Sequence, residues 1–86
     1  MIETPHSRAV KLIADLPPGA DALVHSLTGG HDFCSRMVSL GFTAGAPITV
    51  RQNYGRGPVV VAVRGTLVAL GRTEASRIFV HPSEVS

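Results

Sequence analysis

The sequence predicts a mainly β fold: a small, partly open barrel of about five strands, with one α-helix between strands and a short C-terminal helical turn. Length and composition are the first observations behind this prediction, because 86 residues suffice for one domain and nine Gly with six Pro indicate many turns. The second is that most apolar residues lie in short runs typical of strands, and only one stretch shows the 3.6-residue repeat of a helix. We expect one domain over residues 9–81, with tails over 1–8 and 82–86.

The first strand is expected over residues 9–16, where apolar residues alternate weakly. Its predicted core residues are Val10, Leu12 and Leu16. Pro17-Pro18-Gly19 is a turn signal, because Pro presets the backbone of a turn and Gly tolerates positive φ. A second strand follows over 20–27, with Ala22 and Val24 on one face.

An amphipathic helix is predicted next, because apolar residues recur at the i, i+4 and i+7 positions. These residues are Phe33, Met37 and Leu40. The candidates for its N-cap are His31 and Asp32. Gly41 is expected to end the helix in the left-handed conformation, and Gly45 to turn the chain into the next strand.

A hairpin is predicted from a strand over 59–64 and a turn at Gly65-Thr66, after a strand over 46–53 and a loop over 54–58. Counting outward from the turn pairs Arg64 with Leu67. The face assigned to the core holds Val61, Val63, Val68 and Leu70. The opposite face holds Val60, Ala62, Arg64, Leu67 and Ala69. That face is unusually apolar, so it is either ordinary surface or a patch for a partner.

The pattern of the C-terminal segment predicts one helical turn over 73–78, with Thr73 as cap and with Ala75 and Ile78 facing inward. Phe79-Val80 can add a closing strand. Short strands with one helix between the second and the third indicate a barrel of SH3-like type.

Composition narrows the classes of function. The formal net charge is +2 and no run of like charge occurs, whereas a nucleic-acid binder more often has a clustered basic patch. The single cysteine excludes an internal disulfide and fits a reducing compartment. No stretch has the length of a signal peptide's apolar core or of a membrane span. We therefore expect a soluble, cytoplasmic protein that does not bind nucleic acid.

Motifs of catalysis are missing: there is no Gly-x-Ser-x-Gly elbow, no phosphate loop and no close acidic pair, so we expect no enzymatic activity. His31 and Cys34 are the best metal-capable pair, since they share a helix face and suit zinc or ferrous iron. Two ligands are too few for a closed site, so any weak Fe(II) or Zn(II) binding would use a site shared between two molecules. Three other histidines are scattered, and only a fold could gather them: His6, His25 and His81.

Several short motifs occur together in a fixed order: Leu16-Pro17-Pro18-Gly19, Arg36-Met37, Leu40-Gly41-Phe42, Gly45, Ile48-Thr49-Val50, Gly57-Pro58-Val59 and Val68-Ala69-Leu70. On these motifs the chain resembles the FeoA family, the small cytosolic partners of the ferrous iron permease FeoB, from about Lys11 to Val80. The resemblance implies an SH3-like barrel and a non-enzymatic role in ferrous iron uptake that requires no cofactor. It also implies contact with the cytosolic region of FeoB, which includes a G-protein domain, and with the membrane only through that partner.

Most motif residues are expected to be structural, foremost the turn residues Gly19, Gly41, Gly45, Gly57, Pro58 and Gly65. The expected contact surface joins the helix end, with Arg36, Leu40 and Phe42, to the outer hairpin face. Its occupant is FeoB or a second copy of the chain. Two alternatives stay open: a transition-metal module with a site shared between subunits, and an SH3-like domain that binds nucleic acid or peptide.

Overall fold

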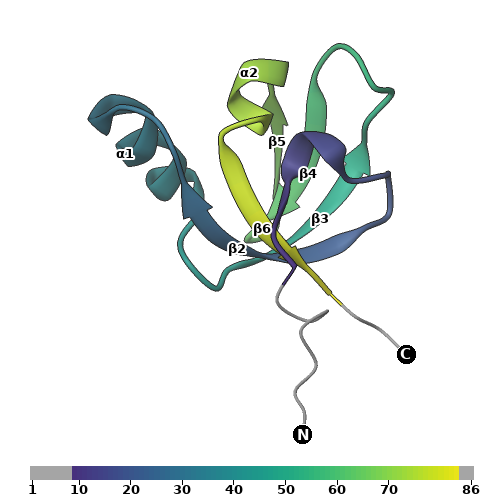
Figure 1. The fold of residues 1–86 in the computed structure, drawn as a ribbon, viewed down its shortest axis with the longest axis horizontal. Coiled ribbons are helices and arrows are strands. Elements are labelled where there is room, and N and C mark those ends of the chain that lie inside the picture. The colour runs from purple at the N-terminus through teal and green to yellow at the C-terminus, as the bar shows by residue number, and fades with distance from the viewer. Residues whose placement is uncertain (1–8, 84–86) are drawn as a thin grey trace, which may run out of the picture.

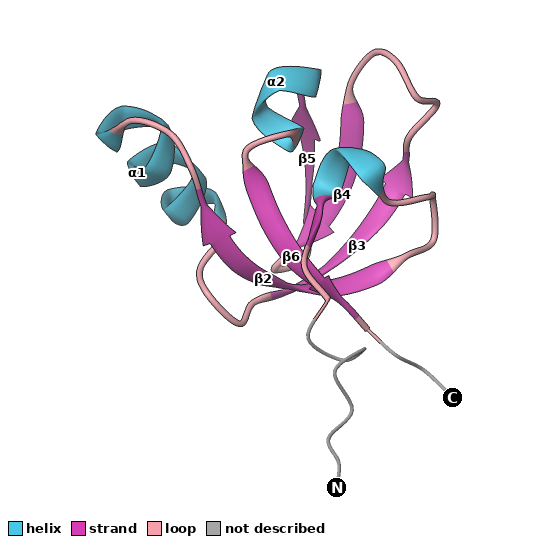
Figure 2. Ribbon diagram, viewed as in Figure 1, coloured by secondary structure: helices cyan, strands magenta, loops and turns pink. Residues whose placement is uncertain are grey.

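The computed structural model describes residues 9–83, which form six strands, two α-helices and one 3-10 helix (Figures 1 and 2). In chain order these are β1 (Lys11–Leu12), the 3-10 helix η2 (Ile13–Asp15), β2 (Asp21–Leu27), α1 (His31–Leu40), β3 (Pro47–Gln52), β4 (Val59–Val63), β5 (Thr66–Leu70), α2 (Arg72–Ala75) and β6 (Ile78–Pro82). The strands form one antiparallel sheet in the order β1-β6-β2-β3-β4-β5. The mainly β, partly open barrel is confirmed, with six strands rather than about five.

The helices occupy different places around the sheet. In Figure 1, α1 stands to one side of the barrel, where the chain leaves β2. In contrast, α2 packs against β5 and η2. The buried hydrophobic residues form one core, and no polar or charged residue is buried among the described positions. No helix within residues 9–83 is both long and apolar enough to cross a membrane.

The first predicted strand is partly wrong. β1 covers only two residues, and the chain then coils into η2, which buries the adjacent residues Ile13 and Ala14. An alternating pattern cannot predict two consecutive buried residues, because a strand sends neighbours to opposite faces. Leu16 is buried as expected, but Val10 is 42% exposed. In β2, the expectation for the core residues holds, because both Ala22 and Val24 are buried.

The predicted helix is present, but its N-cap and the burial of its last apolar residue differ from expectation. Gly30 is the N-cap and no side chain caps the helix, so the assignment of His31 or Asp32 is wrong. Phe33 and Met37 are buried, whereas Leu40 is 38% exposed. The amphipathic face therefore ends one turn early, because the chain reverses directly after Leu40.

Gly41 ends α1 in the left-handed conformation, as predicted, with φ +112°. The Phe42 N–H then donates to the Met37 carbonyl at 3.0 Å, which brings the Phe42 side chain back into the core. A Cβ placed on Gly41 would come within 2.8 Å of Arg64 Cδ. The backbone angle thus favours glycine, and an added Cβ would also displace the flexible side chain of Arg64.

The β4–β5 hairpin turns at Arg64-Gly65, where φ is +52° and +77°, and not at Gly65-Thr66. Positive φ at both central residues is the geometry that matches the twist of paired strands. The true register pairs Val61 with Val68, so every partner differs from the prediction by two positions. Because side chains alternate with a period of two, both predicted faces survive this error. Only Arg64 changes place, from the outer face into the turn.

The C-terminal helical turn begins one residue earlier than predicted and ends at Ala75, so Ile78 lies in β6 and not in the turn. Gly71 is the N-cap of α2, and its N–H donates to Glu74 Oε1 at 3.0 Å, so Thr73 is not the cap. Ala75 and Ile78 are fully buried, as predicted.

The closing strand β6 pairs with both β1 and β2. It ends at Pro82, one residue beyond the expected domain boundary at 81. The expected N-terminal tail over 1–8 lies outside the described residues, as do 84–86 of the C-terminal one.

Candidate functional site

Two cross-strand pairs on β4 and β5 form an apolar surface on the outside of the barrel. Val60 lies opposite Ala69, and Ala62 lies opposite Leu67, so the four side chains share one face. We call these four residues the outer hairpin surface. Leu67 is 61% exposed, Ala69 is exposed, and the two β4 residues are half-buried. A leucine this exposed on an apolar face is available for contact with another molecule.

The outer hairpin surface borders an open strand edge. Among the described residues β5 pairs with β4 alone and stands last in the sheet order. Natural edge strands are usually protected by charged residues, Pro or a bulge. The segment 66–70 contains no charge and no Pro, and its register with β4 has no bulge. Apolar side chains and free backbone groups therefore lie next to each other.

Arg64 connects this hairpin to the end of α1. Its side-chain carbons lie against Gly41, which places the β4–β5 turn beside the C-terminus of the helix. Leu40, the residue before Gly41, is partly exposed there. The predicted combination of helix end and outer hairpin surface thus has a physical link through Arg64.

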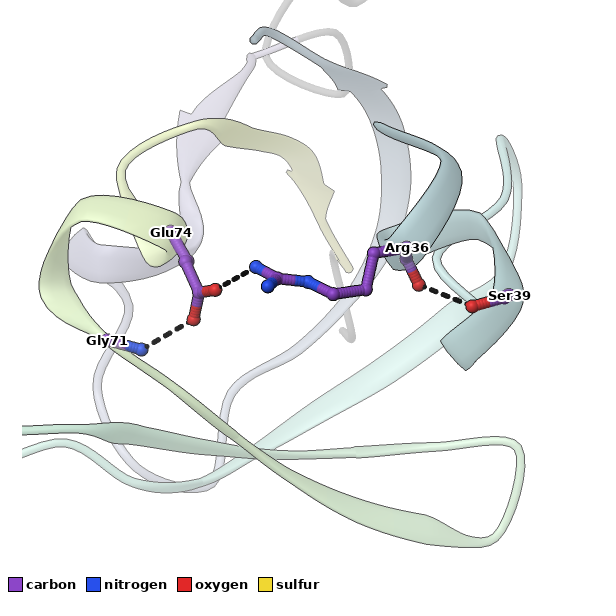
Figure 3. A network of polar contacts seen from close by, with 4 residues as sticks. All are labelled: Arg36, Ser39, Gly71 and Glu74. Atoms are coloured by element: carbon purple, nitrogen blue, oxygen red, sulfur yellow. Dashed lines mark hydrogen bonds and ion pairs between the residues drawn. The ribbon is translucent and has the colours of Figure 1, made fainter. Parts of the chain in front are cut away.

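Arg36 lies on α1 but is engaged within the chain (Figure 3). Its Nη2 donates to Glu74 Oε2, and the other oxygen of that carboxylate accepts from the Gly71 N–H. The backbone carbonyl of Arg36 accepts from Ser39 Oγ at 2.7 Å. The side chains of Arg36 and Glu74 are 56% and 29% exposed, so this bridge between α1 and α2 is open to solvent. A partner that uses Arg36 would compete with Glu74 for it.

Phe42 is fully buried, so the expectation that it belongs to an exposed contact surface is wrong. The physical reason is the helix stop itself, which folds this residue back onto the core. The described structure leaves Arg36 and Leu40 from the helix end, together with the outer hairpin surface, accessible to solvent.

A polar network around Asn53 was missed by sequence reasoning. Asn53 Nδ2 donates to the carbonyls of Ala14 and Leu16 at 3.0 and 2.7 Å. Its Oδ1 accepts from Arg72 Nη1 at 2.8 Å and from the Gly55 N–H at 2.9 Å. The network joins η2, the β3–β4 loop and α2. A lone Asn before a Gly-rich loop is an ordinary turn residue by pattern, so no local signal could have identified it.

The two candidate metal ligands on α1, His31 and Cys34, gain no third protein ligand among the described residues. His31 Nε2 lies 3.5 Å from Ser35 Oγ, and Cys34 Sγ donates to the Gly29 carbonyl at 3.8 Å. Within residues 9–83, no three His, Cys, Asp or Glu side chains gather as a metal site would require, and no pocket is found. The fold does bring together two of the scattered histidines, His25 and His81, whose ring centres lie 4.7 Å apart.

Comparison with known proteins identifies a family whose sequence model this chain matches. The sequence model of the FeoA domain matches residues 11–82. A protein of Methanocaldococcus jannaschii, provisionally named Fe(2+) transport protein A, is 32% identical over 66 residues, which cover 77% of this chain and 79% of that protein.

Solved structures give the same result. A crystal structure of an iron uptake regulatory protein, FeoA, superposes with a TM-score of 0.82 at 32% identity, covering 87% of this chain and all of the other. The zinc complex of Stenotrophomonas maltophilia FeoA, described as a procaryotic SH3 domain protein, has a TM-score of 0.74 at 29% identity, covering 81% of this chain and 88% of the other. The expected SH3-like fold is thereby confirmed.

Proposed function

The chain belongs to the FeoA family of ferrous iron transport, and on that premise we propose that it is a non-enzymatic accessory protein that docks on the cytosolic region of a FeoB-type permease. The outer hairpin surface is the proposed docking site, with Leu40 and Arg36 at its margin. The protein would act in the cytoplasm and reach the membrane only through this partner.

The single observation behind this choice of surface is the exposure of Leu67 among apolar neighbours. A side chain of this size, 61% exposed between Ala62 and Ala69, gains free energy when a partner removes it from water. Contact surfaces combine such an apolar centre with a polar rim, and enzymes instead need an enclosed site. The exposed guanidinium of Arg64, at the turn next to the surface, supplies part of such a rim.

The use of the arginines argues against the nucleic-acid alternative. Binding to nucleic acid depends on several Lys or Arg side chains that reach phosphates together. Four arginines instead make contacts within the chain: Arg36 with Glu74, Arg64 over Gly41, Arg72 with Asn53 and Arg77 over the ring of Phe33. We therefore expect no binding to short DNA or RNA at physiological salt.

The decisive experiment is a binding titration of the full chain with the purified cytosolic region of the FeoB permease from the same organism, with and without nucleotide. Leu67→Glu should leave the fold intact, because this side chain points to solvent, and should weaken binding at least about tenfold by placing a charge in a desolvated contact. Tyr54→Glu is the matched control, since Tyr54 is 77% exposed in the loop at the far end of β4. If a folded Leu67→Glu variant binds the permease and supports iron uptake at wild-type levels, the docking site lies elsewhere.

A second candidate is a transition-metal module with a site shared between two molecules, and the zinc complex of the Stenotrophomonas maltophilia relative favours testing it. His31 and Cys34 would contribute two ligands from each copy. Zinc or ferrous iron should then promote dimers in sedimentation and raise the melting temperature, and Cys34→Ser should abolish both effects. Indifference of the wild type to metal would dismiss this candidate.

A further inference from the structure

Two histidines far apart in the sequence meet on the outer face of β2 and β6. Val24 pairs with Val80, but the next pair is Ser26 with Phe79, so His25 is the extra residue of a β-bulge. A bulge redirects the side chain of the residue it contains. The rings of His25 and His81 lie edge to face, with centres 4.7 Å apart and planes at 87°.

The hydrogen bond of His81 determines which of its nitrogens is free. His81 Nδ1 lies 3.2 Å from the carbonyl oxygen of Ala9. Because a carbonyl only accepts, the neutral ring must bear its proton on Nδ1, which leaves the lone pair on Nε2. Histidines that bind metals usually donate their second nitrogen in this way, since the bond fixes both the tautomer and the ring orientation.

His25 is arranged similarly. Its Nδ1 lies 2.8 Å from Ser26 Oγ, a hydroxyl that can donate or accept, and in the tautomer whose Nδ1–H donates to this oxygen Nε2 is the remaining ligand atom. Two imidazoles bound through Nε2 to one tetrahedral zinc, with Zn–N of about 2.1 Å, have ring centres roughly 5 Å apart. The observed separation of 4.7 Å is close to that value. His25 is exposed and His81 is half-buried, so an ion can reach the pair from solvent.

We propose that His25 and His81 form a two-imidazole site for a borderline divalent transition-metal ion such as Zn²⁺. Imidazole nitrogen suits these ions, whereas Mg²⁺ and Ca²⁺ prefer oxygen ligands. Two protein ligands leave the other coordination positions to water or to a ligand atom from another molecule. The site lies on β2 and β6, not on the hairpin of β4 and β5, so it stands independently of the proposed docking surface.

The test is calorimetric titration of the tag-free full chain with zinc chloride in a weakly coordinating buffer, repeated with Co²⁺ to follow its absorption bands. We expect one ion per chain and affinity lower by about tenfold or more in both His25→Ala and His81→Ala. Asp15→Asn, at an exposed carboxylate outside β2 and β6, is the matched control and should bind as the wild type does. His31→Ala and Cys34→Ser distinguish this site from the shared site on α1. Proton NMR should show zinc shifting the ring resonances of His25 and His81 but not those of His31.

Three results would overturn the proposal. Absence of zinc binding by the wild type would mean that the ring pair is a packing contact only. Unchanged affinity in the His25→Ala/His81→Ala double variant would place the ion elsewhere, and loss of binding in Cys34→Ser would assign it to α1. Circular dichroism of each variant checks folding, and His25→Gln provides a polar substitution at this exposed position if the alanine variant is unstable.

Discussion

The region around Asn53 and the region around α1 are both attached to the barrel by side-chain contacts, but the contacts differ in burial and number. Asn53 makes four hydrogen bonds, and those to Ala14, Leu16 and Arg72 are partly buried. The polar bridge from α1 is the exposed pair of Arg36 with Glu74. Buried hydrogen bonds are costly to break because their partners are left unsatisfied, whereas exposed ion pairs exchange readily with water.

This difference suggests how stability is distributed. The Asn53 network joins three segments that pack on one core, so it should open only when the barrel unfolds. α1 is held mainly by Phe33 and Met37, by the stop at Gly41 and by two exposed arginine contacts. Local opening costs least where few buried contacts hold an element. We therefore expect α1 to exchange its amide hydrogens before the strands do.

The largest effect should come from Asn53→Ala. Truncation leaves the Leu16 carbonyl without its side-chain donor and removes the Oδ1 acceptor of Arg72 Nη1, whereas the Ala14 carbonyl keeps Arg72 Nη2 as a donor at 3.2 Å. One partly buried unsatisfied group costs about 1–3 kcal/mol. We expect urea denaturation to show a loss of about 2–3 kcal/mol. Tyr54→Ala is the control and should stay within about 0.5 kcal/mol. A similarly small loss for Asn53→Ala would remove the distinction between the two regions.

Gly41→Val tests the attachment of α1 at its C-terminus. A β-branched residue at φ +112° is strained, and its Cβ would also collide with the side chain of Arg64. The expected loss is about 1–3 kcal/mol. Gly30→Val should cost less, because Gly30 has an extended backbone and open space around it. Equal denaturant midpoints for wild type and Gly41→Val would show that this stop is dispensable.

Arg77→Ala should have a smaller effect. The Arg77 guanidinium lies 5.5 Å from the centre of the Phe33 ring, and an exposed cation–π contact contributes about 0.5–1 kcal/mol. Thermal melting should therefore shift only slightly. Arg77→Lys retains the charge and should recover part of the lost stability. If Arg77→Ala is as unstable as Asn53→Ala, Arg77 has another structural role.

Arg36→Ala should have the smallest effect on global stability, about 0–1 kcal/mol, because its ion pair is open to solvent. Hydrogen exchange should nevertheless become faster in α1 and stay unchanged in β4. Glu74→Gln is the complementary variant, since it removes the charge but retains an acceptor for the Gly71 N–H. Unchanged exchange in α1 would show that the bridge does not restrain the helix.

The β4–β5 hairpin shows which structural features the sequence pattern can predict and which it cannot. The turn was predicted one residue too late because Arg64 was not expected at positive φ, which few residues other than Gly, Asn and Asp adopt. The two faces were nevertheless correct, since a shift of two positions conserves the alternation of side chains. The pattern therefore places Leu67 correctly on the outer face, although its partner across the hairpin is Ala62 and not Arg64.

The sequence by itself determined the features that depend on neighbours along the chain. The helix stop at Gly41, the turn glycines, the alternating strands and the family motifs are all local patterns. Only the tertiary structure decided which distant groups meet. Asn53 bonds to a carbonyl 39 positions away, Arg36 reaches Glu74, and His25 reaches His81. A polar side chain has the same local pattern whether its partner is water or another side chain, so its bonding follows from how the sheet curves and closes on its core.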